Sequence, residues 1–397
     1  MAIDAEKDRV RLTAKEAAAR LGIKRETLYA YVSRGMITRK TGDDSRTSTF
    51  DPNEVDRLAR RRRGRRGEQM TATITTSITR ISEEGVRYRG REPASFLDEQ
   101  LPFESVAWWL ITGRSLGVDD WQPNSSAVSL ARSISSALPE DATALDRLRI
   151  AVAAAAAADP LRHDLASPER CAPTIIESML GALDPLYSDD AVPERLWRAL
   201  SPAPAQVSTL ACMSTALVLL ADHGLAASTF AARIAASAHA DPYSVVLTGL
   251  GPVGGVLHGG ASRKVHELYA AASLDGAAEA LRTHLLRDPR IPGLGHSVYV
   301  ERDPRFRVLS DSVRSAYRRN PRLATVLDVY ELATTQVHQP PNVDLALGAL
   351  TFLADMTPDA GEAIFAIART AGWLAHGAEE YTERPLRLRP QATYVGN

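Results

Sequence analysis

The chain has 397 residues, of which 45% are hydrophobic and 24% charged, so it can bury a sizeable core and is not broadly disordered. Its net charge of -1 hides an asymmetry, because residues 1–67 hold 18 Lys or Arg and 10 Asp or Glu, whereas residues 68–397 hold 29 and 38. Two cysteines exclude a disulfide-rich scaffold, charges at the N-terminus exclude a signal peptide, and no apolar run approaches the ~18–20 residues of a membrane span. We therefore expect a soluble cytoplasmic protein whose basic head and acidic body have different partners.

The first 35 residues carry the pattern of two short helices. Thr13–Glu16 has capping-box spacing ahead of an apolar stripe, and Gly22 ends this helix. Lys24–Ser33 forms a second helix, which Gly35 ends. Two short helices joined by a tight turn at a glycine are typical of a helix-turn-helix.

The residues that follow predict a hairpin and a third helix. Residues 37–50 place turn formers between two β-tolerant runs, and Asp51–Glu54 supplies an N-cap, a proline at the first helical position and a carboxylate in the first turn. This helix runs into Arg60–Arg66, a linker or a phosphate-contacting tail. With these elements, the first 60 residues resemble the excisionase and MerR-type winged helix-turn-helix modules.

A basic module of this kind predicts that residues 10–66 bind double-stranded DNA, with the helix from Lys24 to Ser33 in the major groove and the Arg60–Arg66 run at phosphates. Four side chains would face the DNA: Lys24, Arg25, Thr27 and Tyr29. A dimeric body would present two such modules to a pseudo-palindromic site. Two alternatives stay open, because an arginine run can be a solvated linker and small helical modules also mediate protein contacts.

Residues 68–397 are predicted to be mainly α-helical, with strand signals centred on residues 72–90. Gly249–Gly254 fits G-x-G-x-x-G, but its surroundings are Ala-rich and Pro252 lacks the N–H that a phosphate turn uses. We interpret this segment as a flexible loop ahead of a helix. The nine histidines form no H-E-x-x-H motif and the cysteines no C-x-x-C pair, so we expect no metal.

Three segments of the body carry side chains suited to carbonyl chemistry. His258 stands beside two glycines, His296 follows a Gly-rich loop with Arg305 nine residues later, and Asp344 ends an Asn-Val-Asp triplet. Two imidazoles, a carboxylate and an arginine can remove a proton alpha to a carbonyl and stabilise the oxyanion that forms.

The order of the motifs in the body resembles that of the citrate synthases over nearly all of residues 70–397. The stretches that carry the resemblance are YRG at Tyr88, LPFESVAWWLITG, AASTFAAR near His223, LHGGA at His258, PGLGH at His296, DPR at Arg305, NVD at Asp344, ARTAGWLAH at Arg369 and RPQATYVG at Arg389. The resemblance implies a helical fold of a large and a small subdomain, the small one covering roughly residues 260–350.

The same resemblance implies roles for three catalytic residues. Asp344 would be the base that takes a proton from the methyl carbon of an acyl-CoA. His258 would hydrogen-bond the thioester oxygen as the enol or enolate forms, and His296 would polarise the ketone of oxaloacetate.

It also implies how oxaloacetate is held. His223 would help to bind it, while Arg305, Arg369 and Arg389 would clamp its carboxylates. In the family the arginine equivalent to Arg389 reaches in from the partner subunit, so the resemblance implies a homodimer. It implies no cofactor, since the CoA thioester is a co-substrate, and no metal.

The predicted function is that of an acyltransferase which converts the acyl group into an alkyl group on transfer. It would condense acetyl-CoA with oxaloacetate and hydrolyse the thioester to citrate and CoA, the tricarboxylic acid cycle reaction. One alternative is a 2-methylcitrate synthase that uses propionyl-CoA, because one methylene in an apolar pocket is worth only about 1–3 kcal/mol. A second alternative is a DNA-binding regulator whose citrate synthase-like body serves as a sensor.

Overall fold

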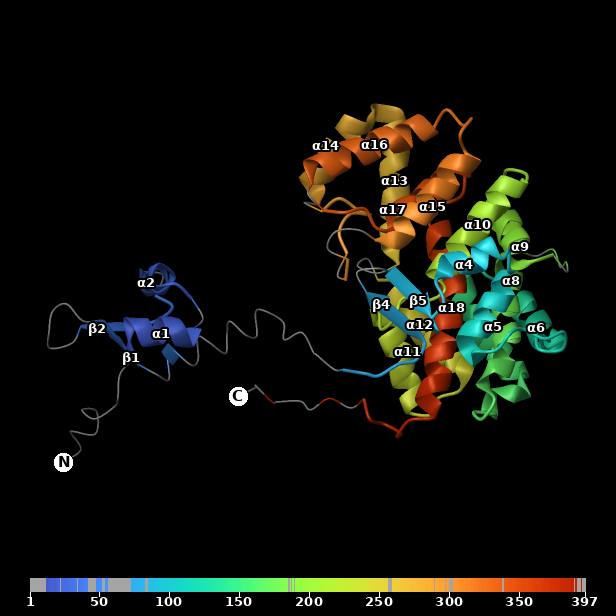
Figure 1. The fold of residues 1–397 in the computed structure, drawn as a ribbon, viewed down its shortest axis with the longest axis horizontal. Helices are drawn as coiled ribbons and strands as arrows, with labels where there is room; N and C mark the ends of the chain where they lie inside the picture. The colour runs from blue at the N-terminus through green and yellow to red at the C-terminus, as the bar shows by residue number, and fades with distance from the viewer. Residues whose placement is uncertain are drawn as a thin grey trace. The chain divides into compact units, whose positions relative to one another are not determined.

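A computed structural model of the chain separates into two units, residues 1–75 and 76–397 (Figure 1). The structure describes residues 12–21, 23–33, 35–41, 48–51, 54–55, 73–82, 85–184, 186, 188, 190–255, 259–288, 290–296, 298–299, 303–337, 339–388, 390 and 394. The boundary that the sequence predicts at residue 67 lies outside the described residues, as does the Arg60–Arg66 run.

The first unit contains two short helices and a three-stranded antiparallel sheet. Its elements are β1 (Leu12–Thr13), α1 (Ala14–Leu21), α2 (Arg25–Ser33), β2 (Arg39–Thr41) and β3 (Ser48–Phe50). The strand order is β1-β3-β2, so β3 is central. The two β-tolerant runs expected in residues 37–50 therefore form the antiparallel β2–β3 pair.

Local sequence signals explain the first helix and its packing. The backbone N–H of Thr13 donates to Glu16 Oε2 at 2.8 Å and the N–H of Glu16 donates to Thr13 Oγ1 at 3.3 Å, which is the predicted capping box. The buried side chains of α1 recur at helical spacing and share a small apolar core with Leu28 of α2 and Phe50 of β3. Of the helix predicted from Asp51, the described residues include a helical Glu54 and Val55.

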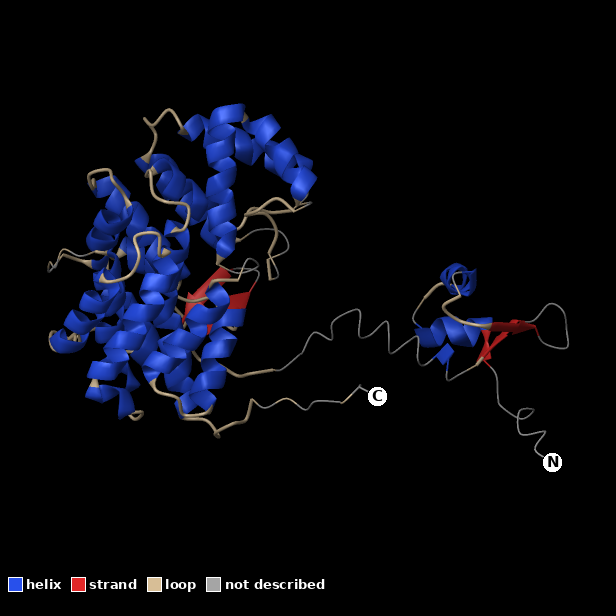
Figure 2. Ribbon diagram, turned by 180° about the vertical axis from the view of Figure 1, so that it is seen from behind, coloured by secondary structure: helices blue, strands red, loops and turns tan. Residues whose placement is uncertain are grey.

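The second unit is mainly helical, as predicted, and Figure 2 shows its strands in one hairpin. That hairpin is β4 (Thr79–Ser82) with β5 (Gly85–Tyr88). The helices before the site are α4 (Pro93–Asp98), α5 (Phe103–Thr112), α6 (Ser125–Ser136), α7 (Ala144–Ala158), α8 (Ala172–Leu183), α9 (Val192–Leu200), α10 (Val207–Leu220), α11 (Ala227–Ser237) and α12 (Pro242–Val253), with 3-10 turns at Pro160–His163 and Pro168–Cys171. The remainder are α13 (Gly260–Asp275), α14 (Ala277–Arg287), α15 (Pro304–Ala316), α16 (Leu323–Gln336), α17 (Val343–Leu353) and α18 (Ala360–Tyr381).

The long helix α18 forms the centre of this unit. Every residue from Ala360 to Gly377 is buried, which is typical of a helix enclosed by others on all sides. Helices α5, α10, α11 and α12 pack against it. Among the described residues, no helix is long and apolar enough to cross a membrane.

Helices α13 to α17 form a group that packs on the rest of the unit through α15 on α10 and through α13 and α17 on α18 (Figure 1). Side-chain caps start two of them. Asp303 accepts the backbone N–H of Arg305 at the start of α15, and Asn342 accepts that of Asp344 at the start of α17. These two caps place Arg305 and Asp344 in the first turns of their helices.

The prediction of a flexible loop at Gly249–Gly254 is wrong. These residues form the end of α12 and the C-cap that follows it. A Cβ on Gly249 would lie 2.5 Å from the Trp373 ring, so the glycine allows α12 to approach α18 closely. Helix packing therefore overrides the turn preference of a Gly-rich segment.

Candidate active site

A cavity of about 690 Å³ lies in the second unit. Its lining combines the segment after α10, the loop between α14 and α15, the start of α17 and the middle of α18. Five of the seven side chains expected at the site line it: His223, His296, Arg305, Asp344 and Arg369. The other two, His258 and Arg389, lie outside the described residues.

His223 lies in the short segment between α10 and α11, which two contacts hold in place. The Tyr88 hydroxyl lies 3.0 Å from the carbonyl oxygen of Asp222. The backbone N–H of Gly372 in α18 donates to the carbonyl oxygen of Ala221 at 3.0 Å. A Cβ on Gly372 would lie 2.6 Å from that oxygen, so the contact requires glycine.

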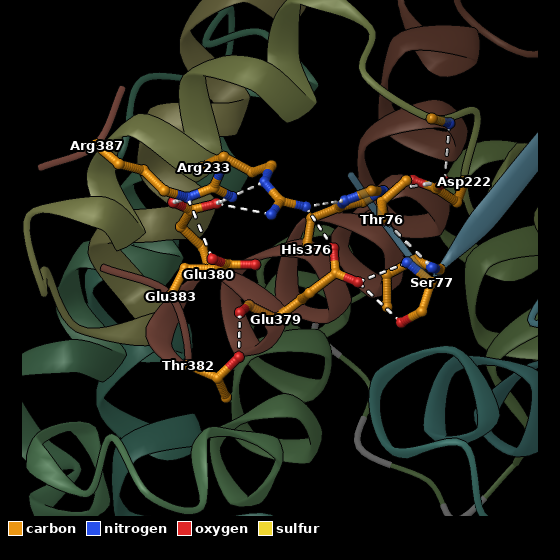
Figure 3. A network of polar contacts seen from close by, with 12 residues as sticks. Thr76, Ser77, Asp222, Arg233, His376, Glu379, Glu380, Thr382, Glu383 and Arg387 are labelled. Atoms are coloured by element: carbon orange, nitrogen blue, oxygen red, sulfur yellow. Dashed lines mark hydrogen bonds and ion pairs between the residues drawn. The ribbon is translucent and has the colours of Figure 1, made fainter. Parts of the chain in front are cut away.

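Behind this segment a buried network of charged side chains joins α11 to the end of α18 (Figure 3). Arg233 is fully buried and pairs with Glu379 at 2.6 Å and with Glu380 at 2.7 Å. Its Nη1 donates to His376 Nδ1 at 3.0 Å, and His376 Nε2 lies 3.4 Å from Asp222 Oδ2. His376 thus links the network to the segment that carries His223.

Arg369 lines the cavity from a buried position on α18, with an exposed fraction of 1%. Its Nε donates to the carbonyl oxygen of Leu220 at 2.8 Å, and its guanidinium lies 4.5 Å from the centre of the Phe365 ring. Burial lowers its pKa to about 10, so it stays charged at neutral pH. Within the described part of the chain it forms no ion pair, and a buried cation of this kind is stabilised by an anionic ligand.

The loop before His296 is fixed to the start of α17. Gly293 and Gly295 have φ values of 78° and 79°, in the left-handed region that favours glycine. The backbone N–H of Asn342 donates to the Gly293 carbonyl oxygen at 2.9 Å, and Asn342 Nδ2 donates to that of Gly295 at 2.7 Å. Because Asn342 also caps the helix of Asp344, it sets the loop of His296 against that carboxylate.

Arg305 and His296 direct two hydrogen-bond donors to one region of the cavity. Arg305 binds both carboxylate oxygens of the buried Asp303, at 3.0 and 2.9 Å. His296 Nδ1 accepts the backbone N–H of Val298 at 3.0 Å, and burial together with Arg305 lowers the pKa of the ring, so the neutral ring carries its proton on Nε2. That Nε2 lies 3.3 Å from Nη2 of Arg305. Because both atoms are donors, an oxygen of a bound ligand would satisfy both.

Asp344 supplies a carboxylate with the properties of a general base. Burial raises the pKa of its carboxyl to about 6, with Arg305 and Arg369 acting in the opposite direction. The carboxylate is therefore mainly ionised at pH 7 and is a stronger base than an ordinary aspartate.

Several residues that hold the cavity side chains in place carry no role predicted from the sequence. Asp303 and Asn342 stand in the quoted DPR and NVD motifs, where their N-cap spacing is a usable signal. Tyr299 and Asp222 hold His223 and its segment through contacts that no local pattern marks. Across the described ranges, no cluster of His, Cys, Asp or Glu could hold a metal ion.

A second candidate site is the surface of α2 in the first unit. Lys24, Arg25 and Tyr29 are exposed and Thr27 is partly buried. Leu28, one helical turn after Lys24, is fully buried in the small core. Three of the four side chains expected to face DNA are thus exposed, and Thr27 lies next to a core residue.

Comparison with known proteins defines the family of the second unit. The citrate synthase C-terminal domain matches residues 67–391. The chain therefore belongs to the citrate synthase family, enzymes that condense an acyl-CoA with oxaloacetate. The match leaves residues 1–66 outside it.

Individual relatives carry two different names. The chain is 32% identical over 199 residues to citrate synthase 2 of Bacillus subtilis, which is 49% of this chain and about half (52%) of the length of that protein. It is 28% identical over 355 residues to the 2-methylcitrate synthase of Mycobacterium tuberculosis, covering 81% of this chain and 88% of that one.

A solved structure shows the fold. The citrate synthase of Thermoplasma acidophilum, in a ternary complex with carboxymethyl coenzyme A and oxaloacetate, superposes with a TM-score of 0.71 at 22% identity, covering 84% of this chain and 96% of that chain.

Proposed function

We propose that residues 68–397 condense an acyl-CoA, with acetyl-CoA preferred, with oxaloacetate and then hydrolyse the thioester to release citrate and CoA. The observation that carries the proposal is the 3.3 Å separation of His296 Nε2 and Arg305 Nη2 in a cavity that also holds Asp344 and Arg369. Among the described residues Arg369 forms no ion pair, so its charge can interact with a carboxylate of the substrate. A 2-oxo dicarboxylate needs such donors and cations, and a carbon acid needs a base such as Asp344.

Oxaloacetate is a dianion, and planar guanidinium groups fit its carboxylates in a bidentate manner. Arg305 and Arg369 would bind the carboxylates, with Arg389 entering from the partner subunit of a homodimer. His223 and His296 are kept neutral by burial and nearby arginines, so they can donate hydrogen bonds without adding charge. His296 would donate to the ketone oxygen.

The chemical step needs a base and an oxyanion stabiliser at the same time, because the alpha proton of a thioester is only weakly acidic. Asp344 would take that proton while His258 donates to the thioester oxygen. The carbon–carbon bond then forms as the methyl carbon attacks the ketone carbon, and His296 donates its proton to the new alkoxide. Removing one donor of this kind typically costs about 3–4 kcal/mol of transition-state stabilisation.

The test is thiol release from acetyl-CoA and from propionyl-CoA in the presence of oxaloacetate. Release above background with either substrate supports the reaction, and none with either from a folded protein contradicts it. The ratio of the two kcat/KM values decides between a citrate synthase and the alternative 2-methylcitrate synthase. One relative is named citrate synthase and another 2-methylcitrate synthase, so the preferred acyl-CoA has to be decided by the ratio of the kcat/KM values.

A second candidate function belongs to the first unit, for which we propose binding of double-stranded DNA by residues 10–66. The exposed Arg25 and Tyr29 of α2, together with the exposed Lys24 just before it, support it. Deleting residues 1–67 should abolish retardation of DNA fragments and leave thiol release nearly intact. Equal retardation by both proteins contradicts DNA binding. DNA binding that responds to oxaloacetate or acyl-CoA, without thiol release, would favour the regulator.

A further inference from the structure

The phenol of Tyr299 contacts His223, one of the histidines that line the cavity, from the side away from the cavity. Its hydroxyl is 3.0 Å from His223 Nε2, and its ring packs against that of His296 with centroids 4.8 Å apart. Tyr299 is only 4% exposed and is absent from the lining of the cavity, which includes its neighbour Val298. Tyr299 therefore contacts the lining residue His223 without facing the cavity.

The direction of this hydrogen bond follows from the partners available. A buried phenol needs an acceptor for its proton, and the acceptor that the described residues offer is His223 Nε2. Burial raises the pKa of Tyr299 to about 12, so the phenol keeps its proton at neutral pH. Burial also holds the pKa of His223 well below its usual range, with Arg305, Arg369 and His296 adding to the effect, so the imidazole is neutral.

We propose that Tyr299 is a positioning residue that holds His223 in the tautomer protonated at Nδ1, so that His223 donates a hydrogen bond to the bound oxo acid. The second nitrogen of a neutral imidazole must carry the proton when the first accepts one. Nδ1 is also the nitrogen that remains for a ligand, since Nε2 is occupied by Tyr299. The proposal rests on oxaloacetate binding in this cavity.

Without the phenol, nothing among the described residues selects this tautomer. His223 could then place its proton on Nε2 and present the lone pair of Nδ1 to an anionic substrate. An acceptor facing a carboxylate or carbonyl oxygen is repulsive, so binding of oxaloacetate would weaken while the proton transfer by Asp344 would not be affected.

The kinetic test uses Tyr299→Phe in the full-length protein, which removes the hydroxyl and keeps the ring. We expect the KM for oxaloacetate to rise about tenfold, the value for one lost hydrogen bond, with kcat changed less than about twofold. Tyr317→Phe is the matched control, because Tyr317 is also buried and its hydroxyl has no hydrogen-bond partner in the described structure. Its KM should equal that of the parent. An unchanged KM in Tyr299→Phe overturns the proposal.

Two further measurements separate a tautomer effect from a general loss of packing. In a His223→Asn background, Tyr299→Phe should not raise the KM further, and an undiminished second increase contradicts the proposal. Nitrogen-15 spectra of the ligand-free protein should show His223 protonated at Nδ1 and, in Tyr299→Phe, at least partly at Nε2. A parent protein protonated at Nε2 overturns the proposal. Because this readout needs no substrate, it decides the tautomer even if thiol release fails and the proposed reaction is wrong.

Discussion

The two units of the chain differ in the burial of the positive charges to which we assign a function. In the second unit Arg233, Arg305 and Arg369 are at most 5% exposed, and each is held by carboxylates, carbonyl oxygens or an aromatic ring. In the first unit the core is entirely apolar, while Lys24 and Arg25 are exposed. Buried charges act strongly and at fixed geometry, whereas exposed ones are screened by salt. We therefore expect function in the second unit to depend on single charged side chains. In the first unit it should depend on the total charge of several exposed side chains.

Within the second unit the two cavity arginines differ as well. Arg305 has a dedicated carboxylate in Asp303, which keeps its pKa high despite burial, whereas burial lowers the pKa of Arg369 to about 10. Arg305 thus has a direct carboxylate partner before any ligand binds, whereas Arg369 interacts with the carboxylates of Asp222 and Asp344 without an ion pair among the described residues. The bound dianion would accordingly interact most strongly with Arg369.

Removing the proposed base should have the largest effect. Asp344→Asn keeps the size of the side chain and removes its ability to take a proton, so kcat for thiol release should fall by about 10²–10⁴-fold. Asp328→Asn, an exposed carboxylate on α16, is the control and should match the parent. A decrease below tenfold in Asp344→Asn would assign the proton transfer to another group.

Breaking the buried network should cost stability rather than chemistry. Glu380 accepts hydrogen bonds from Arg233 and Arg387 and is 1% exposed, so Glu380→Gln leaves Arg233 with less compensation. We expect a loss of about 3–5 kcal/mol in the free energy of unfolding, measured by urea denaturation. Glu383→Gln removes a partner of Arg387 that is 39% exposed and 3.8 Å away, and it should cost less than about 1 kcal/mol. Equal losses in both variants would contradict the importance of burial.

Motif order and local patterns predicted the side chains of the candidate site, whereas the buried network was not predicted. Motif order placed His223, His296, Arg305, Asp344 and Arg369, and the structure brings these five to one cavity. Caps and apolar spacing predicted the two helices α1 and α2 of the first unit, because both signals depend on neighbours within one turn.

Contacts between residues that lie far apart in the chain could not be predicted from motifs or local patterns. Arg233 pairs with Glu380 across 147 positions, and the Tyr88 hydroxyl reaches the carbonyl oxygen of Asp222 across 134. The close approach of Gly249 in α12 to Trp373 in α18 joins residues 124 positions apart. Such pairs are determined by how helices pack, and periodicity reports only which face of a helix is apolar.

The contrast between the two arginines predicts different costs for two equivalent substitutions. Arg305→Gln and Arg369→Gln should each raise the KM for oxaloacetate by about 10–100-fold, since each removes a charged hydrogen-bond donor. Arg305→Gln should also destabilise the fold, because it leaves the fully buried Asp303 unpaired. Arg369→Gln removes a cation that has no ion pair in the described structure and loses only the hydrogen bond to the Leu220 carbonyl oxygen and the contact with the Phe365 ring, so it should lower the unfolding midpoint less than Arg305→Gln does. The same loss of stability in both would show that Arg369 also depends on a carboxylate partner.

The raised pKa of Asp344 predicts an acidic limb in the activity profile. A base must be ionised to accept a proton, so kcat should fall as the pH drops through about 6, by about tenfold per pH unit below that value. Burial favours the protonated form of Asp344 and so raises its pKa. The fall in kcat should therefore begin at a higher pH than it would with an ordinary aspartate as the base. Rates are measured from pH 4.5 to 8 with circular dichroism at each pH as the control for folding. A kcat that is constant down to pH 5 would contradict the raised pKa.

The smallest effects are expected in the first unit, where each exposed charge contributes little. If Lys24 and Arg25 each neutralise one phosphate, Lys24→Ala with Arg25→Ala should make the slope of log affinity against log salt shallower by about 0.9 per contact and weaken DNA binding several-fold for all sequences alike. Lys15→Ala on α1 is the matched control, because Lys15 is also exposed and lies on the other helix. Thiol release should be unchanged in all of these variants. An unchanged slope in the double variant, or an equal change in the control, would show that α2 does not face DNA and that the exposed charge of the first unit serves solvation or protein contacts instead.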